Sequence, residues 1–410
     1  MEELGNESGK LLLPKLKNGG ILMSLTMGDI IYHLFKYPVM LYLKFKFNIK
    51  VEHNPLKEVK GPYLLLGHHV TAFDPIISNI FSRRLIRYVA ADANYDSKLK
   101  RFFLNLFEGI PFTKNAADSS AIRKIIRHIK KGHPVGLYPE GGRNWDGNTD
   151  FIIPSTAKLV KLLRVPVYAI YYKGGYLSKP RWAYYFRKGI MRVEIKEIIS
   201  EDIIAHKSIK EIYKTLVEEL DYNEFEWQKK HKIPFRGKRL AEDIERLLYL
   251  CPECHTINSI ISKDNKFYCK SCGKEHNINE YGTIEGSSHF SDTVSWNRWQ
   301  MSQLPEIIEK GFSFSNPQIS LEKIGEKHRE KFKVLLVIEP DKLIIEYSDK
   351  QREVIDFQDI SGLSITFLDM VEFFVGGIKY RFTFNPKKHM SVKLFYDLLT
   401  TVKEDKKYEF

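Results

Sequence analysis

Residues 64–75 read LLLGHHVTAFDP. The first four residues predict a short buried strand, and the polar residues that follow predict a turn leading into a helix. When strands and helices alternate along a chain, functional residues gather at strand ends. His69 and Asp74 are separated by four residues, so such a turn can fold the Asp74 carboxylate back onto one nitrogen of the His69 ring. This stretch therefore predicts an α/β fold with a His–Asp site at a strand end.

The sequence on either side of this stretch alternates strand-like and helix-like patterns. Ile122, Ile125, Ile126 and Ile129 predict one apolar helix face over residues 120–131. A capping box, Ser208 to Glu211, opens a second predicted helix over 208–220. Short β-branched or aromatic runs predict strands at 48–51, 63–67, 86–91, 135–138, 167–172 and 191–195. Together these patterns predict an α/β domain with a central mixed sheet flanked by helices.

The pair His69 and Asp74 suits general-base chemistry, because the carboxylate fixes the tautomer and leaves the second ring nitrogen to accept a proton. Such a pair serves either a protein nucleophile or a hydroxyl of the substrate. All four cysteines lie at 251–272, and the chain contains no Gly-x-Ser-x-Gly nucleophile elbow. Direct deprotonation of a substrate hydroxyl is therefore favoured. The alternative is that both residues only form a turn and a helix cap.

A second strand ends in a polar turn at residues 135–143, VGLYPEGGR. Its glycines, Gly141 and Gly142, allow the backbone to approach a ligand closely. Arg143 can bind a phosphate through two hydrogen bonds, and Glu140 can hold a substrate hydroxyl or order the site. The alternative is a structural turn with a surface arginine. A third run, 109–115, carries the cation Lys114, whereas 165–170 is typical of a buried core strand.

These four segments, in this order, resemble the glycerolipid acyltransferase family, whose members include the acyltransferases of lysophosphatidate (1-acylglycerol-3-phosphate). The family's first motif, Asn-His-x4-Asp, is similar to the run from His68 to Asp74, and its third, Phe-Pro-Glu-Gly-Thr-Arg-Ser, is similar to the run from Tyr138 to Asn144. The second and fourth motifs match loosely. The resemblance covers roughly residues 25–220.

The resemblance implies acyl transfer without a covalent acyl-enzyme and without a catalytic cofactor. His69 would be the general base on the acceptor hydroxyl, and Asp74 would orient it. The donor would be acyl-CoA or acyl carrier protein. Glu140, Gly141 and Arg143 would bind the glycerol phosphate of a lysophospholipid, with lysophosphatidate as the expected acceptor and phosphatidate as the product.

Three positions depart from the family pattern. His68 replaces the usual Asn, Gly142 replaces Thr, and Asn115 stands where the second motif usually has Arg. Lys114 lies one residue before Asn115 and is our candidate for the missing charge. These departures bear on the acceptor headgroup more than on the reaction type.

The cysteines form the pattern C-x2-C-x14-C-x2-C, with Cys251, Cys254, Cys269 and Cys272 as the predicted ligands of a zinc ribbon. Four thiolates leave no open position for water, so we expect the Zn2+ to be structural. Redox-active pairs are a minor alternative. Clustered rather than scattered cysteines also indicate a reducing compartment and argue against a secreted disulfide protein.

The C-terminal block predicts several antiparallel strands followed by one helix over 391–402. The number of strands and the closing helix resemble those of a pleckstrin-homology (PH)-like barrel. The predicted strands are 333–338, 342–348, 353–357, 363–366, 371–375 and 378–384. The predicted domains are an N-terminal apolar segment (1–50), a catalytic domain (51–236), a linker with the zinc ribbon (237–285) and a β-barrel-like domain (286–410).

The most apolar stretch, 20–47, is interrupted by charged residues and by Pro38, and it falls short of the roughly 20 apolar residues that span a bilayer. Its aromatic and lysine residues suit the headgroup boundary, although a buried helical hairpin is an equal alternative. A net charge of +13 favours an anionic partner such as lipid headgroups, phosphorylated substrates or nucleic acid. We expect a peripheral or monotopic protein on the cytoplasmic face of a membrane.

Three functions remain open from the sequence. The leading hypothesis is an acyltransferase whose partners are a membrane lipid surface, a lysophospholipid and a thioester donor. The second is an inactive acyltransferase-like zinc-ribbon protein that binds nucleic acid or a protein. An inactive descendant of an enzyme would be expected to lose at least one motif residue, whereas this chain retains all four, namely His69, Asp74, Glu140 and Arg143. The sequence therefore argues against the second hypothesis, and no nucleic-acid partner is expected. The third is a hydrolase that directs the His–Asp pair at water.

Overall fold

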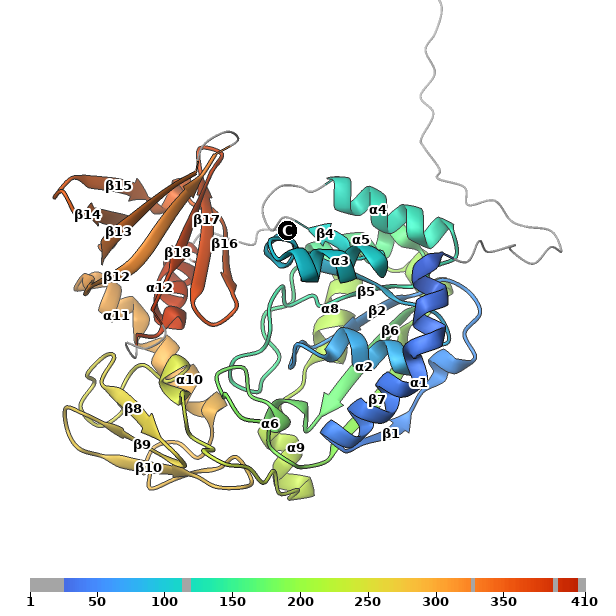
Figure 1. Cartoon of the computed structure of the whole chain (residues 1–410), viewed down its shortest axis with the longest axis horizontal. Helices are drawn as coiled ribbons and strands as arrows, with labels where there is room; N and C mark the ends of the chain where they lie inside the picture. Colours follow the sequence, from blue (N-terminus) through green and yellow to red (C-terminus); the bar gives the residue numbers. More distant parts are fainter. Residues whose placement is uncertain (1–25, 113–118, 326–328, 386–389, 405–410) are drawn as a thin grey trace, which may run out of the picture.

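The structure, a computed structural model, describes residues 26–112, 119–325, 329–385 and 390–404. Three sheets follow one another along the chain (Figure 1). The first has seven strands in a helix-covered α/β arrangement, the second has four short strands, and the third has seven antiparallel strands. The expected fold class is confirmed: a mixed α/β sheet, a four-cysteine segment and a β-rich C-terminal part.

The first sheet has the strand order β1-β7-β6-β2-β5-β3-β4. Neighbouring strands run parallel except β6 and β7, which are antiparallel. The central strand β2 is buried along its whole length. The strands are β1 (Ile49–His53), β2 (Leu64–Gly67), β3 (Arg87–Ala91), β4 (Ile110–Phe112), β5 (Val135–Leu137), β6 (Val167–Lys173) and β7 (Met191–Ile199).

Successive side chains of β2 point to opposite faces of the sheet, as strand geometry requires. Leu65 packs into one apolar cluster, and Leu64 and Leu66 pack into a second cluster on the other side. The covering helices are α2 (Asp74–Phe81), α3 (Lys98–Leu106), α4 (Ser119–Lys130), α5 (Ser155–Leu163), α6 (Gly175–Ser178), α7 (Glu201–His206), α8 (Ile209–Leu220) and α9 (Glu224–His231). Short 3-10 turns are η1 (Pro55–Lys57), η2 (Asp92–Tyr95), η3 (Ile244–Arg246) and η4 (Phe357–Asp359).

The strands and helices predicted for the α/β domain lie where the sequence patterns placed them. The capping box that opens α8 is present, because the Glu211 backbone N–H donates to Ser208 Oγ and the Ser208 N–H donates to the Glu211 carboxylate. In α4, Ile125 and Ile129 are buried, but Ile122 is 39% exposed. The apolar face of α4 is therefore narrower than its sequence predicts.

The described part of the N-terminal apolar segment is one helix, α1 (Met27–Phe47), and not a hairpin. Pro38 lies inside α1, which continues past it. The helix tolerates the missing N–H because Tyr32, Leu43 and Phe47 anchor it to the sheet domain on both sides of the proline. Its outward face carries large exposed apolar side chains, namely Met27, Ile30, Leu34, Phe35, Tyr37, Leu41, Tyr42 and Phe45. Among the described helices, none is long and apolar enough to cross a bilayer.

The cysteine segment and the C-terminal part are both antiparallel. The small sheet contains β8 (Ile260–Lys263), β9 (Lys266–Cys269), β10 (Glu275–Ile278) and β11 (Ile284–Glu285), and α10 (Thr293–Ser302) and α11 (Leu304–Glu309) follow it. The last sheet has the order β15-β14-β13-β12-β18-β17-β16. It contains β12 (Phe312–Ile324), β13 (Arg329–Ile338), β14 (Lys342–Tyr347), β15 (Arg352–Asp356), β16 (Ser361–Thr366), β17 (Met370–Val375) and β18 (Ile378–Thr383), and α12 (Val392–Glu404) closes the described chain.

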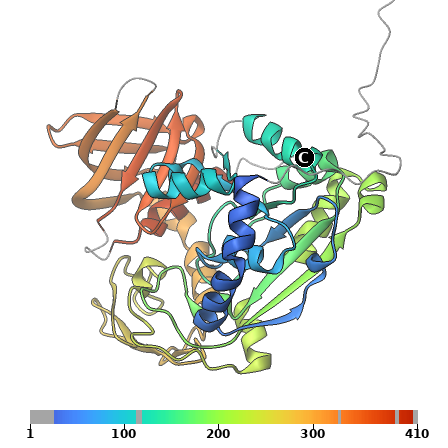
Figure 2. The same ribbon diagram turned by 45° about the vertical axis from the view of Figure 1, so that its right-hand side comes forward.

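The three sheets are joined by buried contacts. Trp145 and Trp182 from the first part share one apolar cluster with residues of the cysteine segment and the C-terminal sheet. Asp146 accepts hydrogen bonds from Thr293 Oγ1 (to its backbone oxygen, 2.6 Å) and Asn297 Nδ2 (to its side chain, 2.8 Å), both on α10. Figure 2 shows the C-terminal sheet beside α3 of the first part. Both added parts therefore pack against the α/β part.

Candidate active site

The two polar turns expected to carry function lie side by side, because they follow the carboxyl ends of the paired parallel strands β2 and β5. The Asn144 backbone N–H donates to the His69 carbonyl oxygen at 2.6 Å, which fastens one turn to the other. Gly67, the last residue of β2, has no room for a side chain, since a Cβ there would lie 2.7 Å from Ile170 Cγ2. Close packing of β2 against β6 thus excludes a side chain at the last position before the first turn.

His69 and Asp74 form the expected pair, with Nδ1 of His69 2.8 Å from Oδ2 of Asp74. The Asp74 carboxylate is fully buried at the start of α2, and it also accepts hydrogen bonds from the backbone N–H groups of Val70 and Thr71 and from the Thr71 hydroxyl. A carboxylate at a helix N-terminus is stabilised by the unpaired N–H groups there. Because a carboxylate accepts but does not donate, Nδ1 of His69 carries the hydrogen and Nε2 has a free lone pair.

The electrostatics of His69 favour a neutral imidazole. Burial lowers the pKa of His69, the hydrogen bond and charge of Asp74 raise it, and the nearby cations Arg143 and Arg181 lower it further, so that the pKa lies below its ordinary value. The ring stacks on Tyr138 with a centroid separation of 4.2 Å, and the side chain is 21% exposed. Among the described residues, Nε2 has no hydrogen-bond partner. A neutral, oriented imidazole with an accessible nitrogen is what a general base requires.

His68 has a different environment from His69. Its Nε2 accepts a hydrogen bond from the Tyr172 backbone N–H at 3.3 Å, and its ring stacks on Tyr222 at 4.8 Å. Burial lowers the pKa of His68 to about 4, so the ring is neutral. It is 2% exposed, and Nδ1 has no partner among the described residues. His68 therefore packs beneath the turn and presents no free nitrogen to solvent.

Glu140 connects the two turns. One carboxylate oxygen accepts from the His69 backbone N–H at 2.9 Å, and the other accepts from the Asp150 N–H at 2.8 Å. Burial raises the pKa of Glu140 to about 8. Gly141 adopts a φ of +70°, a conformation that side-chain-bearing residues rarely adopt. Of the two roles considered for Glu140, these bonds match the ordering of the site.

Arg143 follows the same turn and is half-buried. Within the described ranges its side chain has no hydrogen-bond or ion-pair partner. Burial lowers its pKa, and the charge of Asp74 acts in the opposite direction. The turn thus brings a cation without an anionic partner close to His69. Lys114, the other predicted phosphate ligand, lies outside the described residues.

The sequence of this region matches a known family model. Residues 48–173 match the model described as Acyltransferase. These residues form an acyltransferase domain. The match contains both polar turns, His69, Asp74 and Arg143, and it confirms the resemblance drawn from their motifs.

Comparison with solved structures gave further likenesses. One is the 1-acyl-sn-glycerophosphate (LPA) acyltransferase PlsC from Thermotoga maritima, with 17% identity and a TM-score of 0.41 over 49% of this chain and 81% of that one. Another is the N-terminal PH domain of human ARAP2, with 14% identity and a TM-score of 0.19 over 25% of this chain and 87% of that one. No curated protein matched the chain.

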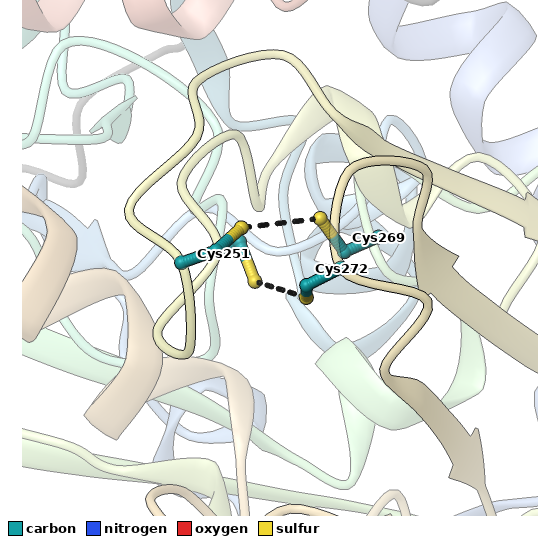
Figure 3. A group of neighbouring side chains, drawn as sticks. Cys251, Cys269 and Cys272 are labelled. Atoms are coloured by element: carbon teal, nitrogen blue, oxygen red, sulfur yellow. Dashed lines mark hydrogen bonds between the residues drawn. The ribbon is translucent and has the colours of Figure 1, made fainter.

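The four cysteines converge from two loops of the segment that follows the acyltransferase domain, with their sulphurs facing one another (Figure 3). Cys251 and Cys272 Sγ are 3.7 Å apart, and Cys254 and Cys269 Sγ are 3.6 Å apart. Ligands 2.3 Å from a tetrahedral Zn2+ stand about 3.8 Å from one another, so these separations fit a Zn2+ site and are far longer than a disulfide. The geometry fits a metal held by all four cysteines.

Two residues of the site were not anticipated from the sequence. Thr71 donates its hydroxyl to Asp74, and its position three residues before a helix-opening aspartate is a recognisable turn signal. Arg181 lies in the connection between α6 and β7, far from both motifs in the sequence. No pattern around Arg181 predicts that it contacts the acyltransferase turn.

Proposed function

We propose that this protein transfers an acyl group from acyl-CoA or acyl carrier protein to the free hydroxyl of a lysophospholipid, with lysophosphatidate as the favoured acceptor and phosphatidate as the product. The observation that carries the proposal is the His69–Asp74 pair, whose free Nε2 lies beside a turn that offers an unpaired arginine. A base and a phosphate-binding cation in one site match an acceptor that bears both a hydroxyl and a phosphate.

In the proposed reaction, His69 Nε2 removes the proton from the acceptor hydroxyl as the oxygen attacks the thioester carbonyl. A carbon–oxygen bond forms and the carbon–sulphur bond breaks, and the departing thiolate takes the proton back from His69. Asp74 stabilises the transient imidazolium. Glu140 is a positioning residue that holds the His69 turn, and Gly141 and Arg143 bind the acceptor phosphate. His69 gains one proton and then loses it, so the enzyme ends the cycle in its starting protonation state.

The α1 and α3 surfaces support a proposal that the protein works at a membrane face. The eight exposed apolar side chains of α1 are joined by Leu99, Phe102 and Phe103 of α3, which are 68%, 61% and 48% exposed. Both helices also carry lysines, and a helix with apolar, aromatic and basic residues suits the headgroup boundary. A lipid acceptor is delivered from such a surface. We propose peripheral or monotopic association with an anionic membrane, on the cytoplasmic side because the cysteines require a reducing compartment.

We also propose that the four cysteines hold one structural Zn2+. The site lies in the segment between the acyltransferase domain and the C-terminal sheet, and Cys251 and Cys269 are buried. Its four thiolates leave no position for a substrate. The metal would fix the geometry of the segment and take no part in the acyl transfer.

The test is thiol release by purified protein in detergent, with acyl-CoA as donor and with or without lysophosphatidate. We expect thiol release that depends on the acceptor and is lost in a folded His69→Ala variant. Thiol release that is independent of any acceptor would instead indicate a thioester hydrolase. If no lysolipid and no thioester gives turnover above the variant, the acyltransferase proposal fails.

A further inference from the structure

Arg181 is a buried cation that the proposed base chemistry does not use. Its side chain is held on three sides: Nη1 donates to the Arg143 carbonyl oxygen at 2.6 Å, Nη2 donates to the Phe367 carbonyl oxygen at 2.8 Å, and the guanidinium lies 4.1 Å from the ring centroid of Trp145. Arg181 is 4% exposed, and its Nε has no partner. Both of its hydrogen-bond acceptors are neutral.

Two other buried arginines of the described chain, Arg87 and Arg381, pair with carboxylates. Arg87 binds Asp29 and Glu108, and Arg381 binds Glu372 and Asp96. Arg181 has no carboxylate within ion-pair distance among the described residues. A buried charge without a counterion is costly, and burial together with the charge of Arg143 lowers the pKa of Arg181 well below its ordinary value.

A second cation beside Arg181 makes this site unusual. Burial alone would not indicate a ligand, because Arg187 is also 4% exposed, donates to a carbonyl oxygen (of Leu240) and lies over Trp182. Arg181 differs because it contacts the turn that carries Arg143, and both cations act on His69. Gly142 lies next to this guanidinium, because a Cβ added there would be 3.9 Å from Arg181 Nη1, and the glycine places no side chain at that position.

We propose that Arg143 and Arg181 together bind a phosphate group of the substrate, with Arg181 as the inner cation. This inference rests on the proposed function and deepens it. Two guanidinium groups match the double charge of a phosphate monoester, and each offers several N–H donors. The phosphate supplies the anion that the Arg181 side chain lacks. The ligand is either the phosphate of the acceptor or a phosphate of the donor.

The C-terminal sheet takes part in this site, because the carbonyl that orients Arg181 belongs to Phe367 in the turn between β16 and β17. That turn and the nearby strand β18 contact the acyltransferase domain. Lys100 of α3 lies 4.4 Å from the Phe367 ring centroid, Lys379 pairs with Asp92 at 3.0 Å, and Arg381 pairs with Asp96 at 2.9 Å. Figure 2 shows α3 against the sheet. The C-terminal sheet thus positions a substrate-binding residue.

The first experiment compares Arg181→Gln with wild type for the KM of lysophosphatidate and of acyl-CoA. Loss of a hydrogen bond to a charged group corresponds to about a 10- to 100-fold weaker interaction. A rise of this size in the lysophosphatidate KM assigns the acceptor phosphate, and a rise in the acyl-CoA KM assigns a donor phosphate; either supports the proposal. Unchanged KM values for both would overturn it. Arg181→Lys, which keeps the charge but loses the fork, should lie between wild type and Arg181→Gln.

Arg187→Gln is the matched control, because it removes an equally buried, stacked arginine away from Arg143. It should lower the melting temperature without changing either KM. If Arg187→Gln raised the same KM as Arg181→Gln, a general loosening of the fold would explain both results and the proposal would fail.

The role of the C-terminal sheet is tested by the double variant Asp92→Asn, Asp96→Asn. A rise in the KM that Arg181→Gln raises, but a smaller rise than in Arg181→Gln, supports that role. An unchanged KM contradicts it.

Calorimetry with glycerol 3-phosphate separates this inference from the proposed function, because it needs no turnover. If wild type binds the probe and Arg181→Gln binds it at least about tenfold more weakly, the phosphate site stands even where no acyl transfer is found. If wild type transfers acyl groups but Arg181→Gln binds the probe and both substrates as wild type does, the phosphate site fails and the acyltransferase proposal survives.

Discussion

Replacing Asp74 by alanine and by asparagine should separate its structural from its chemical contribution. Three buried donors, the Val70 N–H, the Thr71 N–H and the Thr71 hydroxyl, point at the carboxylate. Each buried donor left without a partner costs about 1–3 kcal/mol. Asp74→Ala should therefore lower the free energy of unfolding by at least about 3 kcal/mol, a large share of the 5–15 kcal/mol typical of a folded protein.

Asp74→Asn should fold, because the amide oxygen can accept the N–H bonds and the amide NH2 can face the Thr71 hydroxyl. The hydrogen bonds lose their charge assistance, so we expect a loss of about 1–2 kcal/mol. His69 keeps its orientation but loses the negative charge that stabilises the imidazolium. We expect kcat to fall about a hundredfold or more, within the range of general-base contributions.

The assay pairs urea unfolding with acceptor-dependent thiol release for wild type and both variants. We expect the alanine variant to be clearly less stable than the asparagine variant, while both variants lose most of their rate. A wild-type kcat in Asp74→Asn, or a wild-type stability in Asp74→Ala, would contradict these two roles of the carboxylate.

Three further outcomes follow from the structure. Because the neutral form of His69 is the base and its pKa is lowered, the acid limb of the kcat/KM profile should lie below pH 6.5. Asp74 raises the pKa of His69 and Arg143 lowers it, so Asp74→Asn should shift the limb to lower pH and Arg143→Gln should shift it to higher pH. Shifts in the opposite directions would contradict the assignment of His69 as the base. A zinc chelator or Cys251→Ser should remove the bound zinc and lower the melting temperature by at least about 5 °C without an immediate loss of rate, and a chelated protein that melts like wild type would speak against a structural metal. The double variant Leu41→Ser, Phe45→Ser should bind anionic vesicles at least about tenfold more weakly in cosedimentation. Val354→Ser, which removes an exposed apolar side chain on β15 away from α1, should bind like wild type.

The α/β part was predictable because neighbouring residues in the sequence determine its strands, turns and helix starts. The run from Leu64 to Gly67 is short, apolar and followed by polar turn residues, so strand, turn and helix start can each be inferred from neighbouring residues. The closeness of His69 and Asp74 also follows from a single turn. The contact between the two motif turns needs the parallel pairing of β2 with β5, which their similar strand-turn patterns suggest but do not prove.

The remaining features depend on contacts between segments far apart in the chain. Strand β12 was not predicted from the sequence, because Asn316-Pro317 lies inside it and such a pair normally marks a turn. In the structure the strand continues through this pair, with a register shift between Phe314 and Ile319. Pro38 likewise signals a helix end, yet packing on both sides keeps α1 continuous. Arg181 owes its place to carbonyls of Arg143 and Phe367, and a sequence pattern around position 181 contains neither.

The most direct test of the central claim is mass spectrometry of the lipid products after a single turnover of wild type and His69→Ala with acyl-CoA and lysophosphatidate. We expect phosphatidate and free thiol in equal amounts from wild type, and neither above background from a His69→Ala variant that melts like wild type. Free fatty acid in place of the ester, or phosphatidate formed at the wild-type rate by His69→Ala, would contradict acyl transfer with His69 as the base.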